Sequence, residues 1–181
     1  FLLFINALNM FDGINLQSGF YSVLVMSIFV IKNIIPLVSL TIIVSLIFFL
    51  YLNYKNKTFL GESGVQFLAF IISYVIIKSY NSSDTLFFVD EIFIIMALPG
   101  LELLRLFLIR VAKGRHPFKG DREHLHHLLL KILNPTQTFV IIFLSILISI
   151  LIFYIVEYKI LYLIFFSILY SLTIVYLKKS N

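Results

Sequence analysis

The sequence contains no cysteine and few charged residues, and each shortage excludes a class of protein. Without cysteine among its 181 residues, the chain can form neither a disulfide framework nor a thiolate metal site. Charged residues make up only 13% of the chain, whereas they make up about a quarter of an ordinary soluble domain. Apolar residues make up 61%, and the mean hydropathy is +1.05. We therefore expect a protein that lies in a lipid bilayer.

The first residues of the chain predict that a segment precedes it. The chain begins at Phe1 without an initiator methionine, and residues 1–5 are typical of the end of an apolar helix. We expect the C-terminal part of a larger protein, and these residues give no argument for a signal peptide. No interval of about 20 to 50 residues recurs, which argues against a repeat array.

Six apolar runs predict an all-α, polytopic transmembrane bundle of about six spans, plus the end of a truncated seventh. The runs cover residues 20–31, 34–52, 65–77, 86–109, 138–156 and 160–177. A span perpendicular to the membrane needs about 20 residues, and the first and third runs are short for this. We expect residues 1–181 to form a single integral membrane domain.

The basic residues predict which side of the membrane each loop faces. If every run spans, ten lysines and arginines fall on one side and three on the other. The ten are Lys55, Lys57, Arg110, Lys113, Arg115, Lys119, Arg122, Lys131, Lys178 and Lys179, and the three are Lys32, Lys78 and Lys159. Cytoplasmic loops carry such an excess, so we expect loops 6–19, 53–64 and 110–137 and the C-terminus in the cytoplasm. This topology explains the net charge of +5 better than nucleic-acid binding does.

The first of these loops carries Asn6, Asn9 and Asp12 at intervals of three. On a helix this spacing stacks side chains on one face. Two amides and a carboxylate followed by Gly13 form an oxygen-rich site for a hard cation or a sugar nucleotide. A solvated helix end is the simpler alternative.

The second loop ends in Gly-Glu-Ser-Gly, directly before an apolar run. Glu62 or Ser63 could cap the first turn of the following helix, where an acid is favourable. Alternatively, Glu62 is a ligand of Mg²⁺ and Lys57 contacts a phosphate.

The third loop gathers cationic side chains and all four histidines of the chain between Arg115 and His127. This density suits a diphosphate, because arginine offers a planar fork and neutral histidine can donate a hydrogen bond while titrating near pH 7. A zinc site is a competitor, but the spacing of His124, His126 and His127 predicts different helix faces. A plain basic loop remains a further alternative.

Acidic residues within the fourth run can be explained without a role in catalysis. Asp90 and Glu91 lie near its start, so we expect them at the outer membrane interface. Glu102 and Arg105 are three residues apart, which predicts an ion pair. We assign none of the four to catalysis.

Three motifs together resemble those of the polyprenyl-phosphate N-acetylhexosamine-1-phosphate transferases. They are N-x-x-N-x-x-D-G from Asn6, F-L-G-E-S-G from Phe59, and P-F-K-G-D-R-E-H-L-H-H from Pro117. The form of the histidine motif resembles the bacterial branch that acts on UDP-N-acetylglucosamine or related UDP-amino sugars. The resemblance implies attack by a polyprenyl phosphate on the UDP-sugar, with release of UMP, at the bacterial inner membrane. Cell-wall polymer or surface polysaccharide synthesis would follow.

The resemblance also implies a role for each motif residue. It implies a Mg²⁺ site, with Mn²⁺ as an alternative, formed by Asn6, Asp12 and Glu62. The implied catalytic residues are Asp12, Glu62, His124, His126 and His127. The implied substrate contacts are Asn6, Asn9, Asn15, Lys57, Arg115, Lys119, Asp121 and Arg122. The implied partners are a UDP-amino sugar, a polyprenyl phosphate lipid and the membrane; a homodimer is left open, and no nucleic acid is expected.

The chain departs from the family pattern in two ways. The aspartate-rich D-D-x-x-D motif is missing, which agrees with the expected truncation. Asn15, Glu62 and Glu102 stand where the family usually has aspartate. These substitutions leave a catalytically inactive scaffold of the same family as an alternative. A polytopic transporter is a second alternative, because proteins with many spans and polar cytoplasmic loops often move solutes.

The missing motif generates a prediction. We expect the isolated 181-residue polypeptide to be inactive, because part of its metal and carrier-phosphate site is absent. Conversion of UDP-N-acetylglucosamine to UMP by this polypeptide in membranes would contradict that expectation.

Overall fold

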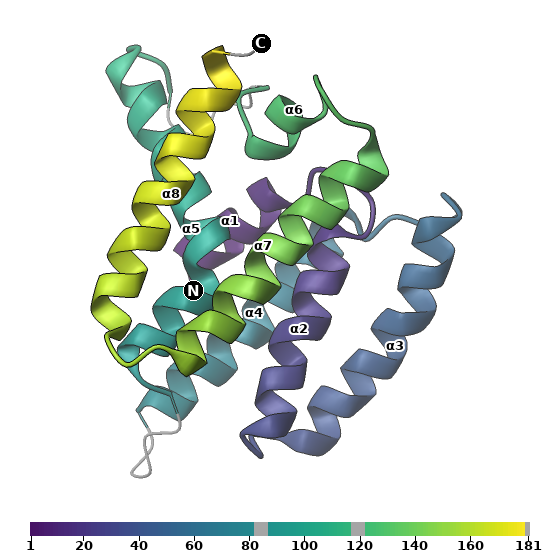
Figure 1. Cartoon of the computed structure of the whole chain (residues 1–181). Coiled ribbons are helices and arrows are strands. Elements are labelled where there is room, and N and C mark those ends of the chain that lie inside the picture. The colour runs from purple at the N-terminus through teal and green to yellow at the C-terminus, as the bar shows by residue number, and fades with distance from the viewer. Residues whose placement is uncertain (82–86, 117–121, 180–181) are drawn as a thin grey trace.

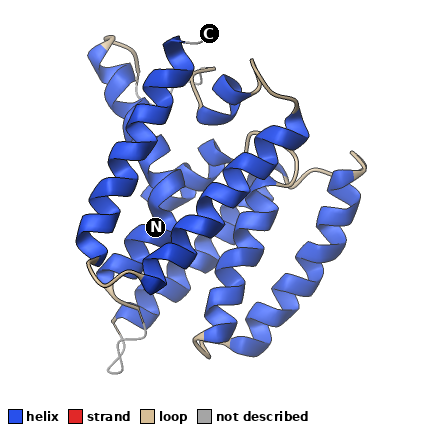
Figure 2. Ribbon diagram, in the orientation of Figure 1, coloured by secondary structure: helices blue, strands red, loops and turns tan. Residues whose placement is uncertain are grey.

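The computed structural model describes residues 1–81, 87–116 and 122–179, and within them every regular element is an α-helix (Figures 1 and 2). The helices are α1 (Leu2–Phe11), α2 (Gln17–Ile31), α3 (Pro36–Tyr54), α4 (Gly61–Tyr80), α5 (Val89–Ala112), α6 (Leu125–Leu129), α7 (Pro135–Ile155) and α8 (Lys159–Lys179). The predicted all-α bundle is confirmed.

Among the described residues, five helices are long and apolar enough to cross a membrane: α3, α4, α5, α7 and α8. The third predicted run meets this length because polar residues at both ends extend α4 to 20 residues. The first predicted run does not. It forms α2, whose 15 residues rise about 22 Å, short of the roughly 30 Å hydrocarbon core. Five of the six predicted runs therefore satisfy length and composition, and the remaining run forms the shorter apolar helix α2.

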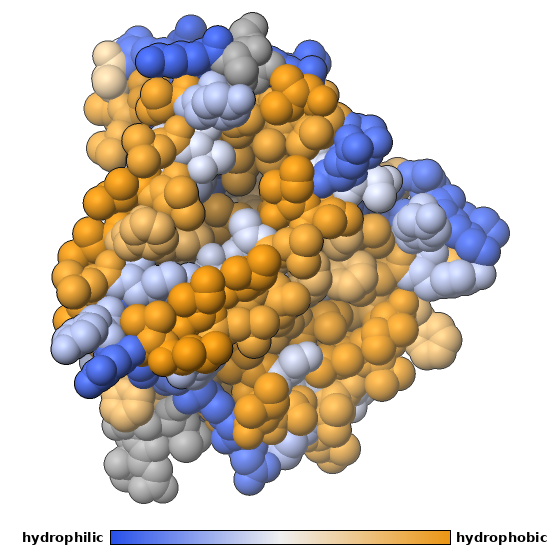
Figure 3. Space-filling view, viewed as in Figure 1, coloured by the Kyte–Doolittle hydropathy of each residue, from blue (hydrophilic) through white to orange (hydrophobic). Residues whose placement is uncertain are grey.

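The outer surface of the bundle is apolar. Fewer than half of the residues in each candidate span are buried inside the protein, and the exposed ones are mostly large hydrophobic side chains. Figure 3 shows hydrophobic residues across the body of the molecule and hydrophilic residues gathered mainly toward its ends. An apolar surface of this extent suits lipid, because helices satisfy their own backbone hydrogen bonds.

The helices bring the three predicted loops to one end of the bundle. In Figure 1 the α2–α3 and α7–α8 turns lie at the lower end, while α6 and the ends of α5 and α8 lie at the upper end. α1 buries Phe4, Ala7, Leu8 and Phe11 on one face and packs against α4 and α5. It therefore delivers its polar C-terminal end to the neighbourhood of the other two loops.

Acidic residues anchor the start of α5 at the lower end. Glu91 Oε2 accepts a hydrogen bond from the Phe88 backbone N–H at 3.0 Å, and Lys32 Nζ lies 2.8 Å from the same carboxylate. Lys159 Nζ lies 3.7 Å from Asp90. Both acids thus occupy the first turn of the helix and face basic residues of neighbouring turns, which agrees with the expected position at the end of a span.

Pro99 interrupts the hydrogen-bond ladder inside α5. Proline has no N–H, so the carbonyl of Ile95, four residues earlier, loses its helical partner. The Tyr21 hydroxyl of α2 is buried and donates to this carbonyl at 3.0 Å. A carbonyl without a partner is costly in a bilayer, so this bond ties α2 to α5 at the interruption.

Replacement of Tyr21 tests this bond. Tyr21→Phe keeps the ring but leaves the Ile95 carbonyl without its donor, and we expect a loss of about 1 kcal/mol of stability. Thermal unfolding in detergent measures the effect, with exposed Tyr80→Phe on α4 as control. Equal unfolding temperatures for the two variants would show that the Tyr21 hydrogen bond contributes nothing.

Candidate active site

A polar cavity of about 540 Å³ lies between the first two loops. Asn9, Asp12 and Asn15 line it from the α1–α2 segment, and Asn53 and Glu62 line it from the α3–α4 segment. Four of these five residues belong to the predicted site. The fold thus brings together two motifs that are about 50 residues apart in the chain.

Asp12 is fixed at the end of α1. Its backbone N–H donates to the Leu8 carbonyl at 3.0 Å, and the Ser18 hydroxyl donates to its Oδ1. Burial raises the pKa of the Asp12 carboxyl, and the hydrogen bond from Ser18 partly offsets that rise. A cation bound nearby would lower the pKa of Asp12, because it favours the charged carboxylate.

Asn53 joins the two loops and was not predicted as a site residue. It is buried at the end of α3, where its Oδ1 accepts from the Leu16 backbone N–H at 2.7 Å and its Nδ2 donates to the Thr58 carbonyl at 2.8 Å. Leu16 has a left-handed backbone with φ of 74°, a conformation that leucine adopts only under constraint. The signal in the sequence was a lone amide at the end of an apolar run.

Asn15 explains one departure from the family pattern. Its Nδ2 donates to the Asn53 carbonyl at 3.3 Å and to Asn56 Oδ1 at 2.6 Å. An aspartate here would place its oxygens against two acceptors, whereas the amide supplies the donor that they need. In this structure Asn15 connects the loops.

Glu62 lies in the first turn of α4 and is exposed at the cavity. Gln66 Nε2 donates to its Oε1 at 3.1 Å. Among the described residues, no side-chain hydrogen bond caps this helix, although Glu62 lies in its first turn, where a negative charge is favourable. The Glu62 carboxylate is placed where a ligand in the cavity can reach it.

The three histidines of the third motif lie together. The ring centroids are 4.3 Å apart for His126 and His127, 5.2 Å for His124 and His126, and 5.8 Å for His124 and His127. The expectation of different helix faces was wrong, because His124 precedes α6 with an extended backbone, at ψ of 151°. Across the described ranges, no group of three or more histidine or acidic side chains is arranged to hold a metal.

His126 connects the third motif to the first. A Cβ atom on Gly13 would lie 2.0 Å from His126 Cε1 and Nε2, so only glycine leaves room for this ring beside Asp12. Burial, with the neighbouring His127 and His124, lowers the pKa of His126 to about 3. This imidazole is therefore neutral at pH 7, which corrects the expectation of titration near neutral pH for this histidine.

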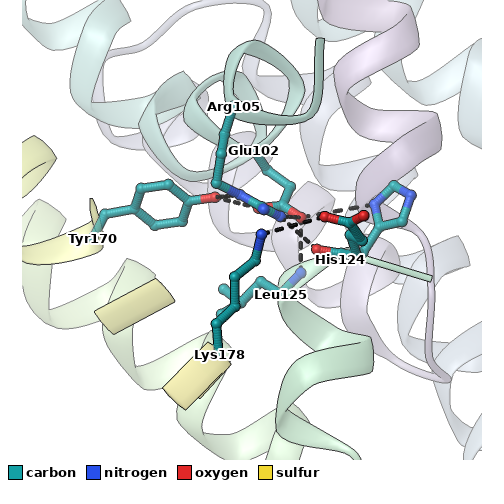
Figure 4. A network of polar contacts seen from close by, with 7 residues as sticks. Glu102, Arg105, His124, Leu125, Tyr170 and Lys178 are labelled. Carbon is teal, nitrogen blue, oxygen red and sulfur yellow. Dashed lines mark hydrogen bonds and ion pairs between the residues drawn. The ribbon is translucent and has the colours of Figure 1, made fainter. Parts of the chain in front are cut away.

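A buried network holds the segment that carries the histidines (Figure 4). Arg105 Nη2 lies 2.8 Å from Glu102 Oε1, which confirms the predicted ion pair. Tyr170 of α8 donates to Glu102, and Leu125 N–H donates to Glu102 Oε1 at 2.7 Å. His124 Nδ1 lies 3.8 Å from the same oxygen.

Other predicted residues lie apart from the cavity or outside the described ranges. Asn6 donates to the Leu2 carbonyl of its own helix at 2.9 Å and lines a separate, mostly apolar cavity between α1 and α5. Lys57, Arg115 and Arg122 are exposed. Lys119 and Asp121 fall in residues 117–121, outside the described part of the chain.

The residues at the cavity suit a magnesium ion in part. Mg²⁺ is commonly held by one or two carboxylates together with substrate phosphates and water. Asp12 and Glu62, which carry carboxylates, line the same cavity, and Asn9 also lines it. Oxygens of a bound phosphate would complete the coordination.

The close approach of His126 to Gly13 gives a direct test. Gly13→Ala forces the imidazole to move, so we expect His126 to react with diethyl pyrocarbonate several times faster than in the unchanged protein. Gly100→Ala is the matched control, because a Cβ there meets no atom within 4 Å. Equal histidine reactivity in the two variants would contradict the contact.

Comparison with known proteins supports the resemblance. Residues 1–80 match the model of "Glycosyl transferase family 4". A relative from Haemophilus influenzae, named undecaprenyl-phosphate alpha-N-acetylglucosaminyl 1-phosphate transferase, is 31% identical over 111 residues, which cover 58% of this chain and 31% of the relative. Relatives of the same name from Yersinia pestis and Escherichia coli K12 are 26% and 28% identical, each over 78% of this chain and 42% of the relative.

The chain spans less than half the length of these curated relatives. No solved structure matches the chain. The predicted resemblance is confirmed at modest identity: residues 1–80 match the model of this family, and the chain is similar to relatives that share one name.

Proposed function

We propose that this chain carries part of the active site of a membrane transferase that joins a sugar phosphate to a lipid carrier. The donor would be UDP-N-acetylglucosamine or a related UDP-amino sugar, the acceptor polyprenyl phosphate, and the second product UMP. One observation carries the proposal: the acids of two loops line one cavity, and His126 of the third loop packs against Gly13 in the wall of that cavity. The names of the relatives support the transfer of N-acetylglucosamine 1-phosphate to a polyprenyl phosphate.

The proposed reaction is a phosphoryl transfer. A phosphate oxygen of the lipid forms a bond to the β-phosphorus of the UDP-sugar, and the bond from that phosphorus to the bridging oxygen breaks. UMP leaves with the electron pair of the broken bond. Two anions must approach each other, so the site must offset negative charge.

Residues at the cavity and beside it could offset this negative charge or hold the loops in place. Asp12 and Glu62 would hold a Mg²⁺ ion, which would neutralise phosphate charge when bound. His126 is neutral, so it has one N–H group that could donate a hydrogen bond to a phosphate oxygen. Asn53 would keep the two acidic loops in register, because it bonds to both.

The position of the cavity suits substrates that arrive from different phases. It lies among loops at an end of an apolar helix bundle, so a soluble nucleotide could enter from water and a lipid phosphate from the bilayer. The excess of basic residues in these loops favours the cytoplasmic side of a bacterial inner membrane. The polymer that would receive the sugar stays a prediction from resemblance, either a cell-wall polymer or a surface polysaccharide.

The structure favours an enzyme over a transporter. Transporters place ionisable groups or broken helices at a substrate site near the middle of the membrane. Here Glu91, Glu102 and Arg105 pair with other protein groups, and the polar cavity lies among the loops. An inactive scaffold of the same family would share this fold, so activity must separate the two.

Membranes of cells that express the protein from its own gene provide the test. We expect Mg²⁺-dependent release of UMP from UDP-N-acetylglucosamine when undecaprenyl phosphate is present. Glu62→Gln should lower this rate by about a hundredfold or more, because the amide cannot replace a carboxylate at the cation. Glu157→Gln, an exposed acid in the α7–α8 turn, is the matched control.

The outcomes distinguish the hypotheses. UMP release that falls in Glu62→Gln but not in Glu157→Gln supports the transferase. Binding of UDP without UMP release, in membranes that contain the lipid acceptor, identifies a scaffold. Full activity of Glu62→Gln returns Glu62 to a structural role in the first turn of α4.

A further inference from the structure

We infer that Glu102, Arg105 and Tyr170 are positioning residues that hold the backbone of the histidine segment against the cavity. The histidine segment is defined as residues 122–129. The inference rests on the proposed function, since it assigns these three residues a part in the same site. None of them touches the cavity, so they would act through the histidines.

The ion pair of Glu102 and Arg105 faces the inside of the protein. Glu102 is buried, and only 12% of the Arg105 side chain is exposed. An exposed pair at this spacing would be explained as an ordinary helix-surface contact. A pair removed from solvent must instead satisfy its remaining donors and acceptors within the protein.

The remaining donors and acceptors of this ion pair bond to main-chain groups of the histidine segment. Arg105 Nη2 donates to the Glu123 carbonyl at 2.7 Å, and Glu102 Oε1 accepts from the Leu125 N–H at 2.7 Å. Both partners are main-chain groups, and they flank His124. The pair therefore fixes the backbone on either side of the first histidine, whatever side chains residues 123 and 125 carry.

The histidine segment needs these bonds to hold its backbone in place. Its only helix, α6, has five residues, and an isolated helix of that length is not stable in water. The Leu125 N–H belongs to the first turn, where no helical carbonyl is available as an acceptor. Glu102 supplies that acceptor from a different helix.

Helix α8 joins the ion pair through Tyr170. The Tyr170 hydroxyl donates to Glu102 and accepts from Arg105 Nε at 3.0 Å, so it bridges both members of the pair (Figure 4). Lys113 and Lys178 add a second attachment through the Glu123 side chain, at 2.6 and 3.2 Å. The Glu123 side chain is 26% exposed, so we expect this second attachment to contribute less.

These bonds keep the His126 ring close to Gly13. The ring occupies the space of a missing Cβ, and a shift of about 1 Å at a reacting centre can cost about a hundredfold in rate. Loss of the anchor would release His126 from Gly13 without removing any residue of the cavity.

Two variants test the inference. Tyr170→Phe removes only the bridging hydroxyl. Arg105→Lys keeps the charge beside Glu102 but loses the planar fork that also reaches the Glu123 carbonyl. Tyr176→Phe, on the same helix and 69% exposed, is the matched control. Each variant is first shown to be folded and monodisperse in detergent.

Two readouts are needed. The first is the rate at which diethyl pyrocarbonate modifies the buried His124 and His126, located by mass spectrometry and measured without substrates. The second is the UMP release described above. In both test variants we expect modification to rise and turnover to fall, each by about tenfold, with Tyr176→Phe unchanged.

The readouts separate the inference from the proposed function. Faster modification in a protein that never releases UMP would support the anchor and contradict the transferase. Unchanged modification and turnover in folded Tyr170→Phe and Arg105→Lys would overturn the inference. Full turnover in Arg105→Lys alone would show that only the charge matters, which also contradicts docking of the backbone.

Discussion

In this protein, several polar groups removed from water have their hydrogen-bond partners on distant segments of the chain. The bilayer supplies no water to a carbonyl or a carboxylate, so each such group needs a partner within the protein. Tyr21 meets this need for the Ile95 carbonyl beside Pro99, and Glu102 meets it for the first turn of α6. These bonds favour particular pairs of helices. Apolar contacts alone do not specify which helices pack together, because the helix surfaces are similarly apolar.

The same requirement builds the candidate site. Asn53 is buried at the end of α3, and its amide satisfies the backbone of two loops at once. The acids of those loops are thereby held around one cavity, with Asp12 fixed by Ser18 and Glu62 left accessible. The third loop joins them through the contact of His126 with Gly13. The candidate site thus arises from bonds that also satisfy the buried polar groups of the loops.

Much of the fold could be predicted from the sequence, because long apolar runs between polar segments leave few alternatives to membrane-spanning helices. The short run that became α2 shows the limit, since periodicity does not tell whether a helix of 15 residues crosses the bilayer. The motif residues Asn9, Asp12, Asn15 and Glu62 were also predicted, since their types suit phosphate and cation chemistry.

The positioning of the site could not be predicted in the same way. Tyr21 and Ile95 are separated by 74 residues, Arg105 and Tyr170 by 65, and Leu16 and Asn53 by 37. Nothing local to a tyrosine or an asparagine in an apolar run shows which distant group it meets. For the same reason, the spacing of Asn6 predicted a shared site, whereas its amide bonds within α1. The histidine rings came together because the backbone is extended at His124, a feature that spacing on an ideal helix omits.

The central claim is that acids from two loops bind one cation beside the histidine segment. The most direct measurement is an anomalous-scattering map from crystals of the protein grown with Mn²⁺ and UDP. We expect one Mn²⁺ peak bounded by the carboxylates of Asp12 and Glu62, with the UDP phosphates on the side of His126. A Mn²⁺ peak elsewhere, with Asp12 and Glu62 facing separate cavities, would contradict the claim.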